Sequence, residues 1–253
     1  MRNMFVALLM LAAVPAVAQD KEKLSAIDLT VRTALTFKVA DSALLQKLLP
    51  AGFELNSPTA GPSKGSNLNL TLIDYLMVQD PEGKPLPPRS TIAMSVPAKK
   101  PATGEAVTVV FGGFIPQAGV PGPYFVFGPA KVNIDRRSHT DAEGKSTIEE
   151  SWQAILDDGG TLEVQLQFTR GELTRSKAAP KIHSAAKPEF YRIYQFEQAA
   201  DVVRSMPNGI DRVSKLSIKA TGPRLAPLFD GSEQLISITS IPFYSRSIYV
   251  PAI

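Results

Sequence analysis

The sequence contains no cysteine and only two histidines among its 253 residues. The absence of cysteine excludes a disulfide framework, thiol catalysis, zinc ribbons and iron–sulfur clusters. Two histidines are too few for a histidine-rich metal site. The formal net charge is only +3, so electrostatics give no reason to expect a nucleic-acid partner. We therefore expect a protein that uses no metal or organic cofactor and binds no nucleic acid.

Long hydrophobic runs are also lacking, apart from one near the N-terminus. Phe5–Val14 is apolar throughout and is followed by Ala16-Val17-Ala18, which has the small-x-small form of a signal-peptidase site. The run is shorter than the roughly 20 apolar residues that a membrane span needs. We expect residues 1–18 to be a cleaved secretory signal peptide. The mature chain is then periplasmic or secreted, without an integral membrane segment; the alternative is an uncleaved N-terminal anchor.

The remaining composition is that of a folded protein. Hydrophobic residues make up 44% of the chain, which is enough apolar surface to offset the entropy lost on folding. The 17 glycines and 21 prolines indicate many turns without reaching a low-complexity composition. The sequence shows no internal repeat and no long linker, so we expect residues 19–253 to form a single β-rich domain.

Residues 27–39 carry the clearest β pattern. Apolar or β-branched residues occupy every second position of this stretch, namely Ile27, Leu29, Val31, Thr33, Leu35, Phe37 and Val39. Such alternation predicts a strand with one buried face. Asp41 then occupies a helix N-cap position, and leucines at helical spacing follow it as far as Pro50. We expect a short helix over residues 43–49.

Further β-rich stretches continue to the C-terminus. They cover residues 67–78, 91–96, 106–111, 124–134, 146–156, 161–168, 212–220 and 235–250. Asp157-Asp158-Gly159-Gly160 predicts a hairpin turn between two of them. Other helical patterns are limited to residues 196–204 and a short turn near Leu228. The predicted fold class is mainly β (α+β), with an antiparallel β-barrel or cone-like sheet and a few short helices.

Standard catalytic motifs are absent from the sequence. It has no G-x-S-x-G elbow, no Walker A loop, no H-E-x-x-H and no EF-hand loop. His139 lies in a polar hairpin tip and His183 follows a Pro-Lys segment. We expect both histidines to be solvated loop residues rather than metal ligands or bases.

One lysine is a candidate for chemistry. Lys131 shares strand parity with Phe125 and Phe127, so a regular strand would place all three side chains on one side. If that side is the interior, burial favours the neutral amine, which can attack a carbonyl carbon to form a Schiff base. The alternative is a lysine whose charge reaches the rim or pairs with an acid.

Three stretches of the sequence resemble the acetoacetate decarboxylase-like family. They are residues 35–55, with a strand, a short helix and a Pro-x-x-hydrophobic-Glu turn; residues 128–132, where the family has an aromatic-Pro-Lys-Lys segment; and residues 222–230, a Gly-Pro-led segment. The strand over residues 236–250 is similar to the closing strand of the family. The resemblance implies a β-rich barrel or cone around a buried apolar cavity. It also implies lyase chemistry at a lysine and assembly into a homo-oligomer.

The resemblance also assigns individual positions. Ala130 stands where the family has its reactive lysine, and Lys131 stands where the family has the neighbouring lysine. Arg32 lies close to the position of the family's early arginine.

Two functional hypotheses from different classes follow. The first is an exported lyase, a decarboxylase or aldolase-type enzyme, in which Lys131 forms a Schiff base with a small carbonyl or keto-acid substrate. Its expected substrate-binding residues are Arg32, Phe125, Phe127 and Tyr244. The second is a non-catalytic periplasmic binder of an apolar or aromatic small molecule, suggested by the many aromatic residues. A buried Lys131 amine without a carboxylate partner favours the lyase, and a rim position favours the binder.

Overall fold

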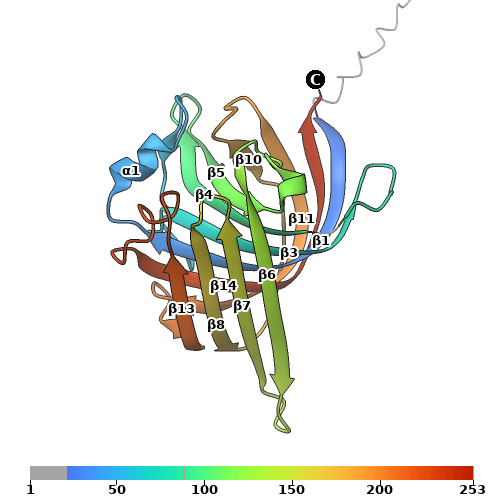
Figure 1. Cartoon of the computed structure of the whole chain (residues 1–253), viewed down its shortest axis with the longest axis vertical. Coiled ribbons are helices and arrows are strands. Elements are labelled where there is room, and N and C mark those ends of the chain that lie inside the picture. Colours follow the sequence, from blue (N-terminus) through green and yellow to red (C-terminus); the bar gives the residue numbers. More distant parts are fainter. Residues whose placement is uncertain (1–21, 88, 253) are drawn as a thin grey trace, which may run out of the picture.

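The computed structural model describes residues 22–87 and 89–252, and the predicted signal peptide lies outside them. Most of these residues are in β-strands (Figure 1). The strands are β1 (Glu22–Lys38), β2 (Glu54–Leu55), β3 (Leu68–Gln79), β4 (Ser90–Lys100), β5 (Glu105–Ile115), β6 (Phe127–Thr140), β7 (Ser146–Leu156), β8 (Thr161–Thr169), β9 (Thr174–Ala178), β10 (Lys181–Ser184), β11 (Tyr191–Ser205), β12 (Ile210–Asp211), β13 (Val213–Ala220) and β14 (Gln234–Pro251). The helices are α1 (Ser42–Lys47) and the single-turn η1 (Gln117–Gly119). No helix in this part of the chain has the length and apolar character that crossing a membrane requires.

Seven strands close into a barrel. Their order around the ring is β4, β5, β10, β11, β14, β1 and β3, and the pairing of β3 with β4 completes it. All neighbouring pairs are antiparallel except β5 and β10. The long strands β1 and β14 come from opposite ends of the chain and lie side by side (Figure 1). The predicted mainly-β, barrel-like fold is therefore confirmed.

A second, four-stranded sheet stands against the barrel. It starts within β6, whose first residues Phe127–Pro129 pair in parallel with β5, whereas Ala130 and the residues after it pair with β7. β8 and β13 complete this sheet. β6 therefore changes partner between Pro129 and Ala130 and carries the chain out of the barrel.

The main hydrophobic core lies between the outer wall of the barrel and the four-stranded sheet, not inside the barrel. On β3, Leu70 and Leu72 are fully buried in this core, whereas the alternate residues Asn69 and Thr71 line the barrel cavity. Trp152 on β7 packs into the core from the sheet. Burying a large apolar side chain contributes about 1.5–3 kcal/mol, so this layer accounts for much of the stability. The face of β3 that points into the barrel carries Asn69 and Thr71, followed by Ile73 and Tyr75.

A buried carboxylate joins the two layers. Glu150 on β7 is only 4% exposed and accepts hydrogen bonds from the Thr33 hydroxyl at 2.7 Å and the Trp152 indole N–H at 3.3 Å. The Nε atom of Arg136 pairs with it at 3.2 Å, and the same guanidinium reaches Asp74 on the barrel wall. Because every polar contact crosses from sheet to barrel or stays within the sheet, the network holds the two layers together.

Most of the predicted elements are confirmed, including the short helix. The Asp41 side chain caps α1 by accepting hydrogen bonds from the backbone N–H groups of Ala43 and Leu44. The Asp157–Gly160 turn joins β7 to β8 as predicted. The helix expected over residues 196–204 is wrong, because these residues belong to β11 and pair with β14 and β9. Strand pairing there overrides the local helical pattern.

Candidate functional site

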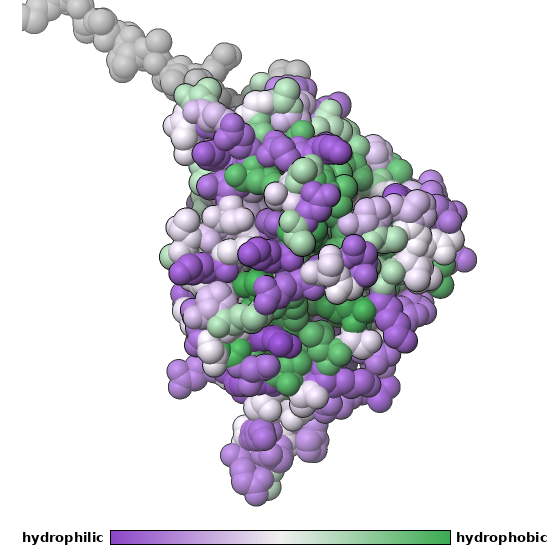
Figure 2. All heavy atoms as spheres, turned by 90° about the vertical axis from the view of Figure 1, so that its left-hand side faces the viewer, coloured by the Kyte–Doolittle hydropathy of each residue, from purple (hydrophilic) through white to green (hydrophobic). Residues whose placement is uncertain are grey.

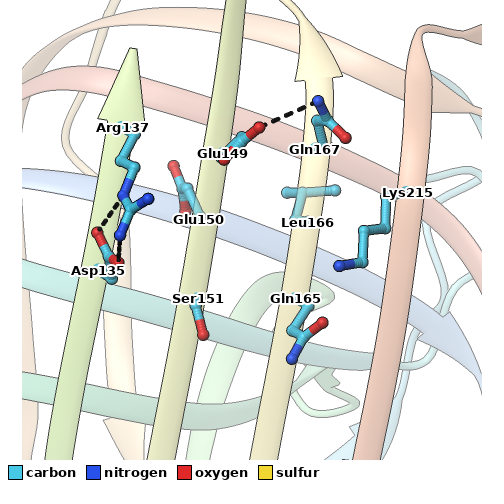
Figure 3. Close-up of a pocket in the computed structure, with 9 residues that line it drawn as sticks. All are labelled: Asp135, Arg137, Glu149, Glu150, Ser151, Gln165, Leu166, Gln167 and Lys215. Atoms are coloured by element: carbon cyan, nitrogen blue, oxygen red, sulfur yellow. Dashed lines mark hydrogen bonds and ion pairs between the residues drawn. The ribbon is translucent and has the colours of Figure 1, made fainter.

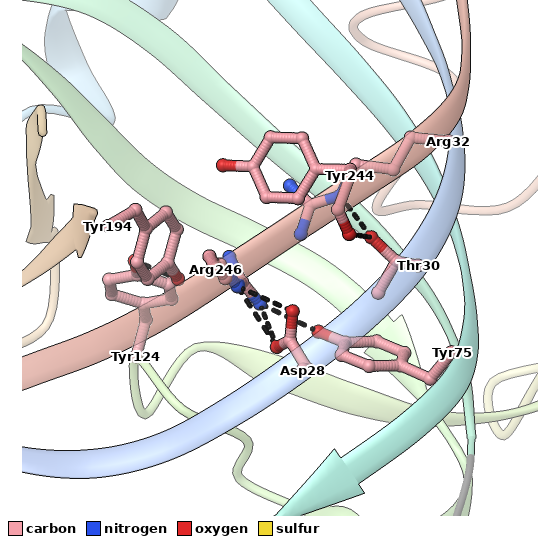
Figure 4. A network of polar contacts seen from close by, with 8 residues as sticks. All are labelled: Asp28, Thr30, Arg32, Tyr75, Tyr124, Tyr194, Tyr244 and Arg246. Atoms are coloured by element: carbon pink, nitrogen blue, oxygen red, sulfur yellow. Dashed lines mark hydrogen bonds and ion pairs between the residues drawn. The ribbon is translucent and has the colours of Figure 1, made fainter. Parts of the chain in front are cut away.

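The barrel encloses a cavity of about 300 Å³. Its lining is polar on several strands, with Thr36, Asn69, Thr71, Thr91, Ser95 and Thr108 among the small residues that face it. Larger side chains also line it, namely Arg32, Tyr75, Tyr124, Phe127, Tyr194, Tyr244 and Arg246. The remaining lining is apolar and consists of Ala34, Ile73, Ala93, Val110, Pro123, Pro180 and Ile182. Two guanidinium groups and four tyrosines therefore converge in one enclosed space (Figure 4).

Arg246 is held by a buried carboxylate. Its Nε and Nη2 atoms contact both oxygens of Asp28 at 2.8–3.0 Å, and Nη2 also donates to the Tyr75 hydroxyl at 3.3 Å (Figure 4). Asp28 is 1% exposed and Arg246 is 5% exposed. The two residues lie directly opposite each other on β1 and β14, which is the position in which cross-strand pairs interact. The charge of Arg246 is therefore compensated inside the protein.

Arg32 differs from Arg246 in having no carboxylate partner among the described residues. Its Nε atom donates to the Thr30 hydroxyl at 2.8 Å, and its Cζ atom lies 3.5 Å from the centroid of the Tyr244 ring. Its Nη2 atom is buried and has no hydrogen-bond partner. Burial and the nearby Arg246 charge both lower the pKa of Arg32. An anion placed next to this guanidinium would offset both effects.

The tyrosines provide neutral hydrogen-bond donors. The Tyr124 hydroxyl donates to the Tyr194 hydroxyl (Figure 4), and burial together with the neighbouring Tyr194 raises the pKa of Tyr124 well above its usual value. Burial also raises the pKa of Tyr244. Both phenols therefore stay protonated near neutral pH, so they can donate to an oxygen atom but cannot act as bases.

The strand pattern explains why these side chains meet. Successive side chains of a strand point to opposite faces, so Asp28, Thr30 and Arg32 share one face of β1. This face points into the barrel, while Leu35 and Phe37 on the opposite parity belong to the hydrophobic core. The polar face of β1 thus contributes side chains to the site, and its apolar face contributes side chains to the hydrophobic core.

The position of Phe127 depends on two glycines. A Cβ atom on Gly113 would lie 2.4 Å from the Phe127 ring, and one on Gly122 would lie 2.8 Å from it. Gly122 also has a positive φ of 72°, which other residues rarely adopt. Only glycine at both positions leaves room for the ring at the edge of the cavity.

The structure brings three of the four predicted binding residues to the cavity. Arg32, Phe127 and Tyr244 line it. The expectation for Phe125 is wrong, because its side chain is 38% exposed and packs edge-on against the ring of Phe190 outside the cavity lining. Phe125 lies in the turn before β6 and has a positive φ of 62°, so the regular parity assumed from the sequence does not hold there.

Lys131 does not meet the condition on which its catalytic role depended, namely a side chain in the interior. Lys131 is exposed and pairs with Ile155 of β7 on the solvent face of the four-stranded sheet. The parity with Phe127 is lost because β6 passes from the barrel to the second sheet, and Ala130 takes the buried position instead. No lysine lines the cavity in the part of the chain that the structure describes. The catalytic role of Lys131 stays a prediction, but it loses the burial on which it depended.

The two histidines lie in different environments. His139 is exposed near the end of β6, as expected. His183 is not a solvated loop residue, because it lies on β10 with 1% exposure between the rings of Phe53 and Tyr191. Its Nε2 atom is buried without a partner. Among residues 22–87 and 89–252, no cluster of three or more His, Asp or Glu side chains is arranged to hold a metal ion.

Sequence reasoning missed Asp28, Tyr75, Tyr124, Tyr194 and Arg246. The sequence contains a sign of two of them, because Asp28 and Arg246 are charged residues within strands whose other residues predict burial. A charged residue in the middle of a long strand has to face either solvent or a buried partner. The sequence does not show which, since the partner strand is far away in the sequence, with a separation of 218 between Asp28 and Arg246.

Two other hollows are less suited to binding a small charged molecule. One of about 290 Å³ lies on the solvent face of the four-stranded sheet (Figure 3). Its Arg137 is already bound to Asp135 at 2.8 Å, and Gln167 donates a hydrogen bond to Glu149. The second, of about 320 Å³, lies between α1, β5 and residues 223–228, and its one charged residue, Arg224, is already paired with Asp157 and Asp158. Hydrophobic side chains gather in the middle of the face that carries α1 (Figure 2).

The cavity is the place where uncompensated positive charge meets hydrogen-bond donors. Beyond its lining, Arg89 lies over the Tyr75 ring and Arg192 over the Tyr124 ring, with Cζ to centroid distances of 5.7 Å and 5.8 Å. No Asp or Glu among the described residues lines the cavity. An arrangement of this kind attracts anions and orients them through directed N–H and O–H donors.

Comparison with solved structures identifies proteins with a similar fold. The enduracididine biosynthesis enzyme MppR matches with 10% identity in its HEPES-bound form (TM-score 0.56, 91% of this chain and 87% of that chain) and in its pyruvate complex (TM-score 0.55, 90% and 89%). An acetoacetate decarboxylase-like enzyme from Sphingomonas wittichii matches with a TM-score of 0.50 and 11% identity over 97% of both chains. Acetoacetate decarboxylase from Legionella pneumophila has the same score and identity, over 95% of this chain and 92% of that chain.

No family model and no curated protein sequence matches the chain. The similarity at this low identity is one of fold, and it confirms the resemblance at that level. The chain has the acetoacetate decarboxylase-like fold.

Proposed function

We propose that the barrel cavity binds a small organic acid of the keto-acid class. In this proposal the carboxylate pairs with the Arg32 guanidinium, and the keto oxygen accepts a hydrogen bond from a tyrosine hydroxyl. The observation that carries the proposal is the state of Arg32, which is buried and has, among the residues that the structure describes, neither a carboxylate partner nor a hydrogen bond to its Nη2 atom.

The energetics favour an anionic ligand over an apolar one. A buried polar group without a partner costs about 1–3 kcal/mol, and more when it is charged. A carboxylate bound to Arg32 removes that cost, and planar guanidinium groups match carboxylates with two parallel hydrogen bonds. An apolar ligand would leave the cost in place. We therefore propose a carboxylate ligand, instead of the apolar or aromatic ligand that the sequence led us to expect for a binding protein.

The fold supports the same ligand class. The MppR structure with this fold contains pyruvate, a small keto acid. The protein is 10% identical to this chain, so it supports the class of ligand and not its identity.

A lyase acting on the bound keto acid is the second candidate, and the neutral tyrosine pair favours it. When a group on the carbon atom adjacent to a keto carbon leaves as CO2 or as an aldehyde, the electron pair of the broken bond moves through that carbon onto the keto oxygen. Hydrogen-bond donors placed at this oxygen stabilise the resulting enolate, which a proton from water then converts to the ketone. Tyr124 donates its own proton to Tyr194, so the Tyr194 hydroxyl is the member of the pair that can donate to such an oxygen. This chemistry needs no imine, in agreement with a cavity whose described lining contains no lysine. Because the sequence predicts a signal peptide, we propose that the protein works in the periplasm or after secretion.

Calorimetric titration tests the proposal with matched ligands. Pyruvate, 2-oxobutanoate and 2-oxopentanoate would each be compared with the corresponding neutral amide. We expect the acids to bind at least about tenfold more tightly than the amides, because only the acids carry a negative charge that can pair with Arg32. Equal affinity for acid and amide, or no binding of any acid by the folded protein, contradicts the proposal. Borohydride treatment in the presence of the same acids distinguishes the imine mechanism from the mechanism without an imine, because only the imine mechanism predicts a covalent lysine adduct.

A further inference from the structure

The charge inside the cavity is set by one carboxylate. Within residues 22–87 and 89–252, Asp28 is the only acid that pairs with a side chain lining the cavity. Both of its oxygens are occupied by Arg246, and both residues are almost fully buried. Of the two guanidinium groups in the lining, Arg246 is therefore neutralised and Arg32 is not.

We propose that Asp28 is the specificity-determining residue of the cavity, because it occupies Arg246 and so restricts the cavity to ligands with a single carboxylate. This inference rests on the proposed function, since it assumes that Arg32 binds the first carboxylate. Without Asp28, the lining would present two unpaired guanidinium groups and would suit a dicarboxylate.

The two arginines lie close enough together for one small ligand to meet both. The Cζ atom of Arg32 lies 3.5 Å from the Tyr244 ring centroid, and that of Arg246 lies 5.8 Å from the same centroid (Figure 4). A second carboxylate that entered the native cavity would face an Arg246 whose Nε and Nη2 groups already bind Asp28 and whose charge is neutralised by it. It would then be buried next to a like charge without a partner of its own. A buried unpaired charge is strongly unfavourable, so the dicarboxylate is rejected.

Two acids that differ at one end test the inference. 2-Oxopentanoate ends in a methyl group where 2-oxoglutarate ends in a carboxylate, and otherwise the chains are the same. We expect the wild-type protein to bind 2-oxopentanoate at least about tenfold more tightly than 2-oxoglutarate. In Asp28→Asn, which keeps the shape of the side chain and removes its charge, we expect the ratio of the two dissociation constants to move by about tenfold or more toward 2-oxoglutarate.

A double variant guards against a folding defect. Asp28→Asn leaves Arg246 buried without its partner, whereas Asp28→Asn with Arg246→Gln removes both charges together. We expect the double variant to keep the wild-type preference for 2-oxopentanoate, because Arg32 is then, as in the wild type, the only unpaired charge in the lining that the structure describes. A merely structural role for Asp28 would weaken the binding of both acids alike and leave their ratio unchanged.

The outcomes separate this inference from the proposed function. If the folded wild-type protein binds neither acid, the proposed function fails and the role of Asp28 fails with it. If the wild type binds 2-oxopentanoate but prefers 2-oxoglutarate, or if Asp28→Asn folds and keeps the wild-type ratio, only the role of Asp28 is overturned. If Asp28→Asn does not fold, the double variant is used instead. A double variant that binds 2-oxoglutarate more tightly than 2-oxopentanoate also overturns the role of Asp28.

Discussion

The guanidinium of Arg32 lies over the ring of Tyr244, with its Cζ atom 3.5 Å from the ring centroid, where the first and last strands of the barrel pair. Tyr244 is itself stacked on Phe196 at 4.9 Å. Stacking on an aromatic face holds a guanidinium in place without using its N–H groups. The N–H groups of Arg32 that do not contact Thr30 therefore remain available for a ligand, and this arrangement is the basis of the proposed site.

Lys131 offers a direct comparison between the imine mechanism and the proposed site. We expect Lys131→Gln to leave keto-acid binding unchanged within error, because Lys131 is exposed on the outer sheet and does not line the cavity. The measurement is the same calorimetric titration, combined with borohydride trapping and peptide mass mapping. A lysine adduct in the wild type that disappears in Lys131→Gln would restore Schiff-base chemistry at this residue.

Two neighbouring residues of β3 test where the core lies. Leu72 is fully buried between barrel and sheet, and we expect Leu72→Ala to lower the free energy of unfolding by about 2–5 kcal/mol. Thr71 faces the cavity, and we expect Thr71→Ala to change it by no more than about 0.5 kcal/mol. Chemical denaturation of the two variants gives both values. Similar losses for both would contradict a core outside the barrel.

The buried carboxylate between the layers provides a third test. We expect Glu150→Gln to lower the free energy of unfolding by about 1–3 kcal/mol, because Arg136 and the Trp152 indole lose a charged acceptor that is almost fully buried. Glu149→Gln on the same strand, with an exposed side chain, is the matched control and should have little effect. Equal stabilities of the two variants would show that the network does not join the layers.

His183 makes stability depend on pH. Burial, followed by the charge of Lys100, lowers the pKa of His183 below the value of 6.5 expected in the unfolded chain. Below about pH 6.5 the unfolded chain takes up a proton that the folded protein does not accept until lower pH, so the free energy of unfolding falls as the pH falls. We expect His183→Gln to reduce this fall. Denaturation of both proteins at about pH 7.5 and pH 5.5 measures it, and an identical slope in the variant would rule out His183 as its source.

Local patterns in the sequence predict the strands well, because alternation reports directly on which face of a strand is buried. Residues 27–39 are correctly predicted as a strand on this basis. The same pattern does not reveal that the polar face, with Asp28 and Arg32, is buried as well. That burial depends on closing the barrel through β14 and β3, which is a long-range event that no local pattern encodes.

The errors in the predicted site have related causes. The parity that links Lys131 to Phe127 fails because β6 changes partner after Pro129. Phe125 is placed wrongly because it lies in the turn before β6, with a positive φ of 62°. His183 is placed wrongly because the short strand β10 becomes buried through its parallel pairing with β5. For Lys131 and His183, the environment of the side chain is decided by which strand pairs with its own.

The most direct test of the central claim is the affinity of Arg32→Gln for 2-oxopentanoate, measured by calorimetry beside the wild type and Arg137→Gln. Arg137 is exposed on the outer sheet and paired with Asp135, so it controls for the loss of one positive charge. We expect Arg32→Gln to bind at least about 30-fold more weakly than the wild type and Arg137→Gln to bind as the wild type does. Wild-type affinity in a folded Arg32→Gln would contradict the assignment of Arg32 as the carboxylate-binding residue.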